Sequence, residues 1–296
     1  MDSASAAYAD AVSKAWAESS REVRSFWQSQ VVTASINRLI TGDPDLSPPA
    51  YFKRRFSRKP FKSALSLGSG EGQMERQFVS LDICHRILGV DVSQARVARA
   101  RANVPIQFAD RVEYICANLE EWRPDRQVDL IIAKGVLHHV QALEDWCRLF
   151  AEMLMPEGLL YLDDFVGPTR FQWTTTQLDI INRVLAVLPD DVKIDLVAAD
   201  GRRKERVSPP DVDRLIAADP SEAVRSAEIP EVIKRYMVPI ELKPYGGALY
   251  HPLFSRIMGN FAQHPDLVEL IMELDAILTE QGVIGSDYLW GVYRPR

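Results

Sequence analysis

Short apolar runs alternate with amphipathic stretches after Lys62, and this alternation constrains the fold more than any other feature of the chain. Five runs have the length of strands: 64–67, 87–92, 112–116, 128–133 and 159–165. The stretches around 72–80, 94–103 and 141–154 repeat apolar residues at helical spacing. Strands that alternate with helices of this length pair in parallel through right-handed crossovers. The sequence therefore predicts an α/β fold class with a doubly wound, mostly parallel sheet.

The segments on either side of this core predict three further units. In residues 1–62 we expect N-terminal helices, interrupted near Ser19-Ser20, that form a helical lid and lead into a basic linker. Residues 167–238 combine helical patterns with a charged loop, which predicts a helical insertion over the sheet. Residues 239–296 hold two helical stretches, about 249–261 and 266–281, and a strand candidate at 288–293. They are expected to complete the sheet, together with a strand candidate at 238–243.

Charge and cysteine content narrow the partners of the chain. The 296 residues carry 35 Lys plus Arg against 41 Asp plus Glu, a net charge of −6 that disfavours nucleic acid and anionic membrane. No apolar run approaches about 18 residues, and charged residues throughout the first thirty argue against a signal peptide. The three cysteines lack C-x-x-C spacing, so we expect reduced core thiols. These features predict a cytoplasmic protein with a small-molecule partner, no nucleic acid and no membrane, and they leave open a homodimer.

A glycine-rich turn follows the first predicted strand. Gly68, Gly70 and Gly72 stand at alternate positions, where missing side chains let the backbone approach a ligand. Asp91 ends the next strand about 20 residues later, where a carboxylate accepts hydrogen bonds from ribose hydroxyls. The nicotinamide fingerprint G-x-G-x-x-G would place the third glycine three residues after the second, but here it follows by two. This spacing disfavours NAD.

The segment Leu65-Ser66-Leu67-Gly68-Ser69-Gly70-Glu71-Gly72 resembles the first motif of class I S-adenosylmethionine-dependent methyltransferases, with Ser69 where cysteine is common. Three later segments resemble that family in order: 117–119 after the third strand, 129–140 around the fourth, and the proline-glycine turn at 155–160. The resemblance covers roughly residues 60 to 166 and implies a Rossmann-like, cofactor-binding core at 63–166. The stretch 167–174 resembles a bacterial subgroup with helical insertions. It supports assigning 1–62 and 167–238 as lids over an acceptor.

The resemblance implies S-adenosylmethionine as the cofactor and S-adenosylhomocysteine as the product. It assigns the ribose to Asp91, the adenine to the segment of Asn118, whose amide oxygen would be the acceptor, and the sulfonium to the segment after the fourth strand. The full set of implied cofactor-binding residues is Gly68, Ser69, Gly70, Gly72, Asp91, Val92, Ala117, Asn118, Leu119, Lys134 and Gly135.

The predicted function is transfer of a methyl group to an O, N or S atom of a small molecule by in-line displacement. The leaving group is a neutral thioether and needs no acid, so catalysis rests on holding both reactants in a closed site. A hydroxyl acceptor would need a base, for which His138 and His139 are the first candidates. The residues expected to frame the chemistry are His138, His139, Asp164 and Arg170.

Several alternatives stay open at this point. A regulatory protein could bind the cofactor without turnover, and a nicotinamide-dependent oxidoreductase is a weaker third possibility. Asp163 and Asp164 form a paired carboxylate, but Lys134-Gly135 offers no third oxygen ligand, so we expect no metal. The six cations between Lys53 and Lys62 predict a solvated face. Six aromatic residues are further acceptor-pocket candidates: Trp16, Trp27, Trp173, Tyr245, Tyr250 and His251.

Overall fold

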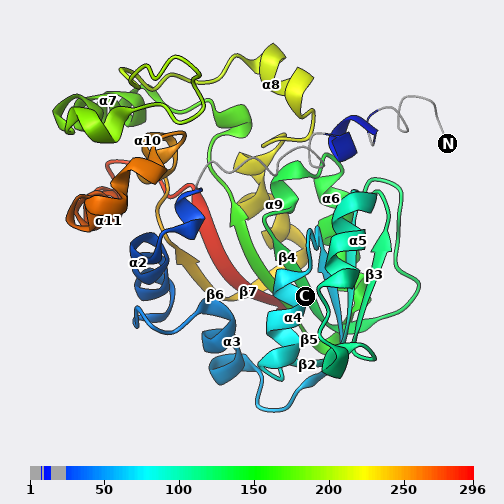
Figure 1. Ribbon diagram of the computed structural model, residues 1–296. Helices are drawn as coiled ribbons and strands as arrows, with labels where there is room; N and C mark the ends of the chain where they lie inside the picture. Colours follow the sequence, from blue (N-terminus) through cyan, green and yellow to red (C-terminus); the bar gives the residue numbers. More distant parts are fainter. Residues whose placement is uncertain (1–7, 9, 15–24) are drawn as a thin grey trace.

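One seven-stranded sheet organises the computed structural model, which describes residues 8, 10–14 and 25–296 (Figure 1). Its strands are β1 (Phe61–Leu67), β2 (Cys84–Asp91), β3 (Val112–Cys116), β4 (Val128–Lys134), β5 (Leu154–Phe165), β6 (Met237–Pro244) and β7 (Tyr288–Pro295). They follow the order β3-β2-β1-β4-β5-β7-β6, and only β7 runs antiparallel to its neighbours. The predicted α/β class with a mostly parallel sheet is confirmed.

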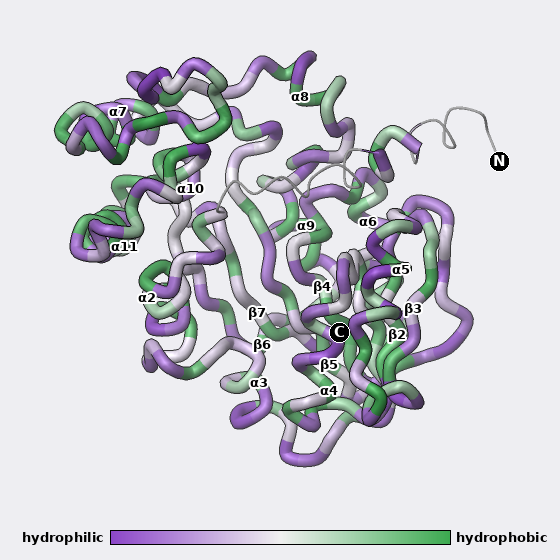
Figure 2. Tube along the Cα trace, in the orientation of Figure 1, coloured by the Kyte–Doolittle hydropathy of each residue, from purple (hydrophilic) through white to green (hydrophobic). Residues whose placement is uncertain are grey.

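Alternate residues of each strand enter two separate hydrophobic cores. In β1, Ala64 packs into one core, while Leu65 and Leu67 pack into the other. The first core is covered by α2 (Gln30–Thr41), α3 (Pro48–Phe56), α4 (Gln73–Ser80) and α5 (Gln94–Ala102). The second is covered by α6 (Leu143–Met153) and α9 (Ile229–Tyr236). Both faces of the sheet are thus apolar, as a doubly wound sheet requires, and Figure 2 shows apolar colour along the strands.

A bulge near the start of β5 explains why this strand begins earlier than predicted. The pairing with β4 jumps from Val128↔Leu154 to Leu130↔Leu159, so residues 155–158 loop out of the register. The predicted proline-glycine turn lies in this bulge. Leu154 still pairs with β4 because its side chain is buried in the second core.

The predicted basic linker is wrong in part, because residues 48–56 form α3. Ser47 accepts a hydrogen bond from the Ala50 backbone N–H, and Pro48 and Pro49 occupy the first helical positions. Proline is tolerated there because those N–H groups have no partner within a helix. Two adjacent prolines thus start a helix within the predicted linker. Arg55 of this helix pairs with Glu241 of β6 at 3.3 Å.

The insertion and the C-terminal part lie above the carboxyl ends of the strands and beside β6 (Figure 1). The insertion contains η4 (Thr169–Phe171), α7 (Thr175–Val187), η5 (Asp190–Lys193), α8 (Val212–Ala218) and η6 (Ser226–Glu228). Helix α9 follows, but it packs on the sheet face, so the part above the strands ends before Ile229. The C-terminal part contains α10 (Tyr250–Phe254), η7 (Met258–Gln263) and α11 (Pro265–Glu280). The single helix predicted at 249–261 is broken at Arg256, whose φ is +70°.

Two smaller expectations can be compared with the structure. Cys84 and Cys147 are buried core residues, but Cys116 at the end of β3 is exposed, against the prediction. The predicted break near Ser19-Ser20 lies outside the described residues, and α2 begins only at Gln30, after the short helix η1 (Phe26–Gln28). Among the described helices, none is both long and apolar enough to cross a bilayer.

Candidate functional site

Two adjoining cavities open at the carboxyl ends of the strands, where doubly wound sheets bind ligands. The first has a volume of about 270 Å³ and lies over β1, β2 and β4. The second has a volume of about 670 Å³ and lies between β4, β5, α2 and the insertion. Lys134, Gly135 and His139 line both cavities and therefore mark where they meet.

Seven of the eleven predicted cofactor-binding residues line the first cavity. They are Gly68, Asp91, Val92, Asn118, Leu119, Lys134 and Gly135. Asp91 is buried, and its carboxylate accepts the backbone N–H groups of Gly70 and Ser93, each at 2.8 Å. These two bonds fix the carboxylate at the end of β2 and hold the glycine turn against it.

The other four predicted residues do not line the cavity but support it. The Ser69 side chain is buried, and Gly72 caps the start of α4 with its φ at +79°. The Gly72 carbonyl accepts the hydroxyl of Tyr114 at 3.2 Å, and a side chain at Gly72 would collide with that ring. Gly70 and Ala117 also lie outside the lining. The glycine pattern therefore shapes the turn more than it contacts a ligand.

Asn118 differs from its predicted role. Its amide oxygen accepts the Glu120 backbone N–H at 3.1 Å, so that oxygen is not reserved for a ligand. Its amide nitrogen is buried and has no hydrogen-bond partner among the described residues. A buried donor of this kind costs free energy unless a ligand satisfies it. The donor fits the ring nitrogens of an adenine, which are acceptors.

Further residues of the first cavity were not predicted from the sequence. Tyr8 and Val12 of the N-terminal segment contribute to it, as do Arg96, Glu120 and Ser221. Arg96 lies in the first turn of α5, shortly after Asp91 in the sequence. Because Asp91 was predicted to bind the ribose, this position could have identified Arg96 as a cavity residue from the sequence. Nothing local marks Ser221, which comes from the insertion.

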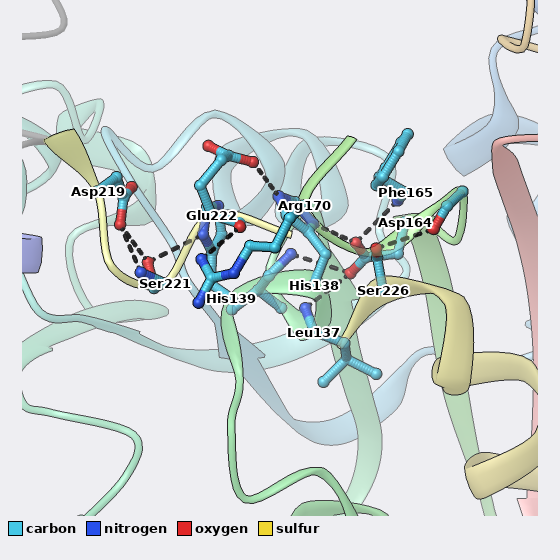
Figure 3. A network of polar contacts seen from close by, with 12 residues as sticks. Leu137, His138, His139, Asp164, Phe165, Arg170, Asp219, Ser221, Glu222 and Ser226 are labelled. Carbon is cyan, nitrogen blue, oxygen red and sulfur yellow. Dashed lines mark hydrogen bonds and ion pairs between the residues drawn. The ribbon is translucent and has the colours of Figure 1, made fainter. Parts of the chain in front are cut away.

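The second cavity centres on His138, at the 3-10 turn η3 (Leu137–His139) that follows β4. Its Nδ1 lies 2.5 Å from Asp164 Oδ1, and its Nε2 lies 3.7 Å from Glu222 Oε1 (Figure 3). Burial disfavours the charged imidazole, but the carboxylates of Asp164 and Glu222 outweigh burial and raise the pKa of His138. His138 is thus held between two acids.

Asp164 supports His138, because both of its carboxylate oxygens already have hydrogen-bond partners. Its side chain is fully buried, and Oδ2 accepts the backbone N–H groups of Val136 and Leu137 at 2.9 and 2.8 Å. Oδ1 accepts the Phe165 N–H at 2.8 Å as well as contacting His138. All of these contacts fix the turn that presents the histidines, so Asp164 is a positioning residue.

His139 faces the junction of the cavities. Its Nδ1 lies 3.1 Å from the Ser221 hydroxyl, which donates to Asp219 Oδ1 at 2.6 Å. Because the hydroxyl donates to Asp219, it accepts the Nδ1 proton of His139. Burial and the neighbouring His138 ring, whose centroid is 4.0 Å away, lower the pKa of His139 well below its ordinary value. The pKa values of the two adjacent histidines are therefore shifted in opposite directions.

Arg170 was expected to frame the chemistry, but its contacts are within the insertion. Its guanidinium donates to the carbonyls of Glu222 and Pro220 at 2.8 and 2.9 Å, and its own N–H donates to the Ala223 carbonyl (Figure 3). It lines neither cavity. Arg170 therefore clamps the insertion loop that carries Ser221 and Glu222, and it does not face the acceptor cavity.

Aromatic and acidic side chains complete the second cavity. Asp163 accepts Lys134 Nζ at 2.6 Å and the Tyr245 hydroxyl at 2.7 Å. Of the six aromatic candidates, Trp27, Tyr245 and His251 line this cavity, whereas Trp173 and Tyr250 do not. Trp16 lies outside the described residues. Glu222 is the main residue that the sequence missed, since nothing around it indicates a site.

Comparisons with known proteins find similarity to methyltransferases in the core of the chain. Residues 65–162 match a family model described as a methyltransferase domain. The chain is 29% identical over 127 residues to the ubiquinone biosynthesis O-methyltransferase of Bradyrhizobium diazoefficiens, which covers 42% of this chain and 47% of that enzyme. It is 31% identical over 109 residues to the trans-aconitate 2-methyltransferase of Escherichia coli O157:H7, which covers 35% of this chain and 40% of that enzyme. The chain thus spans less than half the length of the curated relatives it matches.

A solved structure extends the comparison to the fold. Phosphoethanolamine N-methyltransferase 2 of Haemonchus contortus, in complex with phosphomonomethylethanolamine and S-adenosylhomocysteine, aligns with a TM-score of 0.51. The identity is 15%, and the alignment covers 90% of this chain and 58% of that chain. The two proteins therefore share a fold.

Proposed function

We propose that this chain, whose residues 65–162 form a methyltransferase domain with the class I fold, methylates a small molecule. S-adenosylmethionine would bind in the first cavity, and the acceptor would bind in the second. The observation that carries the proposal is the junction at Lys134, Gly135 and His139, which joins a cavity of motif residues to a larger polar and aromatic one. When bound, the cofactor supplies an activated methyl group.

The residues of the first cavity fit the three parts of that cofactor. The Asp91 carboxylate stands where ribose hydroxyls would donate, and the unpartnered Asn118 amide nitrogen can donate to adenine. Gly135 has a φ of +60°, and a side chain there would meet nothing within 4 Å, so space remains at the junction. This is the place where the methyl group and the acceptor would meet.

The walls of the second cavity favour an acceptor with a flat apolar part and a polar end. Trp27, Phe171 and Tyr288 provide rings on one side, while Lys134, His138 and Glu222 provide polar groups near the junction. Aromatic rings pack well against planar ligands. Predicted proton transfer from a hydroxyl acceptor is assigned to His138 or His139, since both lie at this polar end.

Closure of the site would involve both additions to the core. Tyr8 and Val12 line the first cavity, and the insertion contributes Phe171, Ser221 and Glu222 to the two cavities. We propose a cytoplasmic enzyme, which agrees with the net negative charge and the small number of cysteines.

The proposal is tested by melting curves with S-adenosylhomocysteine or NAD, followed by a screen of small acceptors with methyl-labelled cofactor. A ligand that binds only the folded state raises the melting temperature by mass action. We expect a rise with S-adenosylhomocysteine and none with NAD. A rise with NAD alone would overturn the assignment. Cofactor binding without turnover on any acceptor would instead favour a regulatory protein.

A further inference from the structure

Three potential metal ligands meet at the polar end of the second cavity. His138 and His139 come from the turn after β4, and Glu222 comes from the insertion loop clamped by Arg170. One ligand atom of each residue lies within 4.8 Å of the other two, and His138 Nε2 lies 3.7 Å from Glu222 Oε1. We propose that His138, His139 and Glu222 bind a divalent transition-metal ion at the junction of the two cavities.

The contacts behind the histidines support this site. His138 Nδ1 is held by Asp164, and His139 Nδ1 is held by Ser221, which is itself bonded to Asp219 (Figure 3). Histidines that ligate metals donate their other ring N–H to a carboxylate, carbonyl or water in this way, which fixes the tautomer. With Nδ1 as the donor, a metal would displace any proton from Nε2, and Nε2 of each ring would then supply the lone pair that a metal needs.

The chemistry of the ligands indicates which ions would fit. Two imidazoles and one carboxylate suit zinc, iron(II), cobalt and manganese better than magnesium or calcium, which prefer oxygen ligands. Bonds of about 2.0 to 2.2 Å would require the three side chains to close by roughly 1 Å. Because only three protein ligands are available among the described residues, further coordination positions would face the second cavity.

The location gives the ion a role that rests on the proposed function. An acceptor oxygen that ligates the ion would be held beside Lys134 and Gly135, where the two cavities join. A bound cation lowers the pKa of a hydroxyl that ligates it, so its proton would leave to solvent more readily. The class of acceptor that we infer therefore carries a metal-binding oxygen, such as a hydroxyl or carboxylate.

The sequence predicted no metal because the only potential ligands that it placed together were those at the ends of β4 and β5. Asp163 is occupied by Lys134 and Tyr245, and Asp164 supports His138. The missing oxygen ligand is Glu222, which is distant in the chain and is positioned by the Arg170 clamp. Tertiary structure was needed to find it.

The test uses the full chain after treatment with a chelator and dialysis. Cobalt(II) chloride is titrated into the protein while visible absorption and heat are recorded, and zinc is then titrated in competition. We expect one equivalent of cobalt to bind with micromolar or tighter affinity and to give absorption bands typical of nitrogen and oxygen ligands. The absence of saturable binding for both ions would overturn the inference.

Three variants locate the ion. Glu222→Gln and His139→Ala should weaken cobalt binding by ~100-fold or more, and Ser221→Ala by about tenfold, since partners behind the ligands contribute about 10- to 100-fold. His251→Asn is the matched control, because it removes another imidazole that lines the same cavity and should leave affinity unchanged. Unchanged binding in Glu222→Gln and His139→Ala would overturn the site. We avoid His138 variants because they would leave Asp164 buried without its partner.

Melting curves with S-adenosylhomocysteine separate this inference from the proposed function. Glu222 does not line the first cavity, so Glu222→Gln should keep the shift caused by S-adenosylhomocysteine, which also shows that it is folded. Wild-type protein that binds cobalt but not S-adenosylhomocysteine would refute the proposed function and leave the metal site standing. The opposite result would refute the metal site alone.

Discussion

The two cavities differ in how their walls are drawn from the chain. Apart from Tyr8, Val12 and Ser221, the first takes its residues from 68–140, within the segment that matches the model of a methyltransferase domain. The second combines segments from Trp27 to Tyr288, most of them outside that domain. A cofactor site built from strand ends can therefore be recognised from local motifs. An acceptor site built by additions depends on contacts that no local pattern records.

The cavities also differ in how they hold charge. In the first, Asp91 is held by backbone N–H groups of the glycine turn and of α5. In the second, Asp163 and Glu222 face the side chains of Lys134 and His138, and Asp164 contacts His138 in addition to three backbone N–H groups. The acids of the second cavity therefore depend more on side chains that come from other elements. Substitutions should disturb the two halves differently.

The largest effect is expected for Asp164→Ala. The change removes a fully buried carboxylate that accepts three backbone N–H groups and holds His138. Leaving such donors and a buried imidazole unpaired should lower the free energy of unfolding by about 3 to 5 kcal/mol. Urea unfolding measures this loss. Asp164→Asn keeps an acceptor oxygen and should lose less, so equal losses in both variants would contradict the assigned role.

These residues show how far the sequence could lead. Six of the seven strands lie within a few residues of their predicted positions, because strand alternation and burial on both faces are local properties. Asp91, Asn118 and Gly135 of the first cavity could be predicted for the same reason. Helix α3 was missed because its residues were assigned to a basic linker, although prolines can occupy the first positions of a helix. The positions of Arg170 and Glu222 could not be predicted. The Arg170 guanidinium holds the loop of Glu222 through backbone carbonyls, and only the folded insertion brings these groups together.

The next effect is the pH dependence of the free energy of unfolding, to which buried acids of the core and of the C-terminal part contribute. Burial raises the pKa of Glu75, on α4, from 4.5 to about 7. Folding then favours the protonated acid, so its contribution is complete below pH 4.5 and is lost as pH rises through 7. The loss amounts to roughly 3 kcal/mol, at about 1.36 kcal/mol per pKa unit. Burial raises the pKa of Asp275 to about 6 and of Asp287 to about 7, so both add to the same trend.

Unfolding free energies between pH 5 and pH 8 check this prediction. The wild-type chain should become less stable with rising pH, and Glu75→Gln should reduce the slope without removing it. Glu113→Gln, an exposed position on β3, is the control and should keep the wild-type slope. A Glu75→Gln slope equal to that of the wild type would mean that Glu75 is already ionised when the protein folds.

A smaller effect is expected for Asp91→Ala, which should weaken ligand binding in the first cavity and leave the second cavity unchanged. A charge-assisted hydrogen bond to ribose contributes about 1.5 to 3 kcal/mol. The affinity for S-adenosylhomocysteine should therefore fall by roughly tenfold to a hundredfold, as measured by calorimetry. Cobalt binding at His138, His139 and Glu222 should not change. Unchanged affinity for S-adenosylhomocysteine in a folded Asp91→Ala protein would place the ribose elsewhere.

The smallest effect compares two glycines that share a backbone conformation but not a location. Gly135 has a φ of +60° at the junction of the cavities, and Gly42 has a φ of +83° at the end of α2. A side chain at either position would meet no atom within 4 Å, so Gly135→Ala and Gly42→Ala should each lose only about 1 kcal/mol of stability from backbone strain. Only Gly135→Ala places its methyl group where cofactor and acceptor would meet. Its affinity for S-adenosylhomocysteine should fall several-fold, while that of Gly42→Ala stays at the wild-type value. Equal affinities in the two variants, with equal melting temperatures, would show that the methyl transfer site does not lie at Gly135 and would remove the distinction drawn between the two halves.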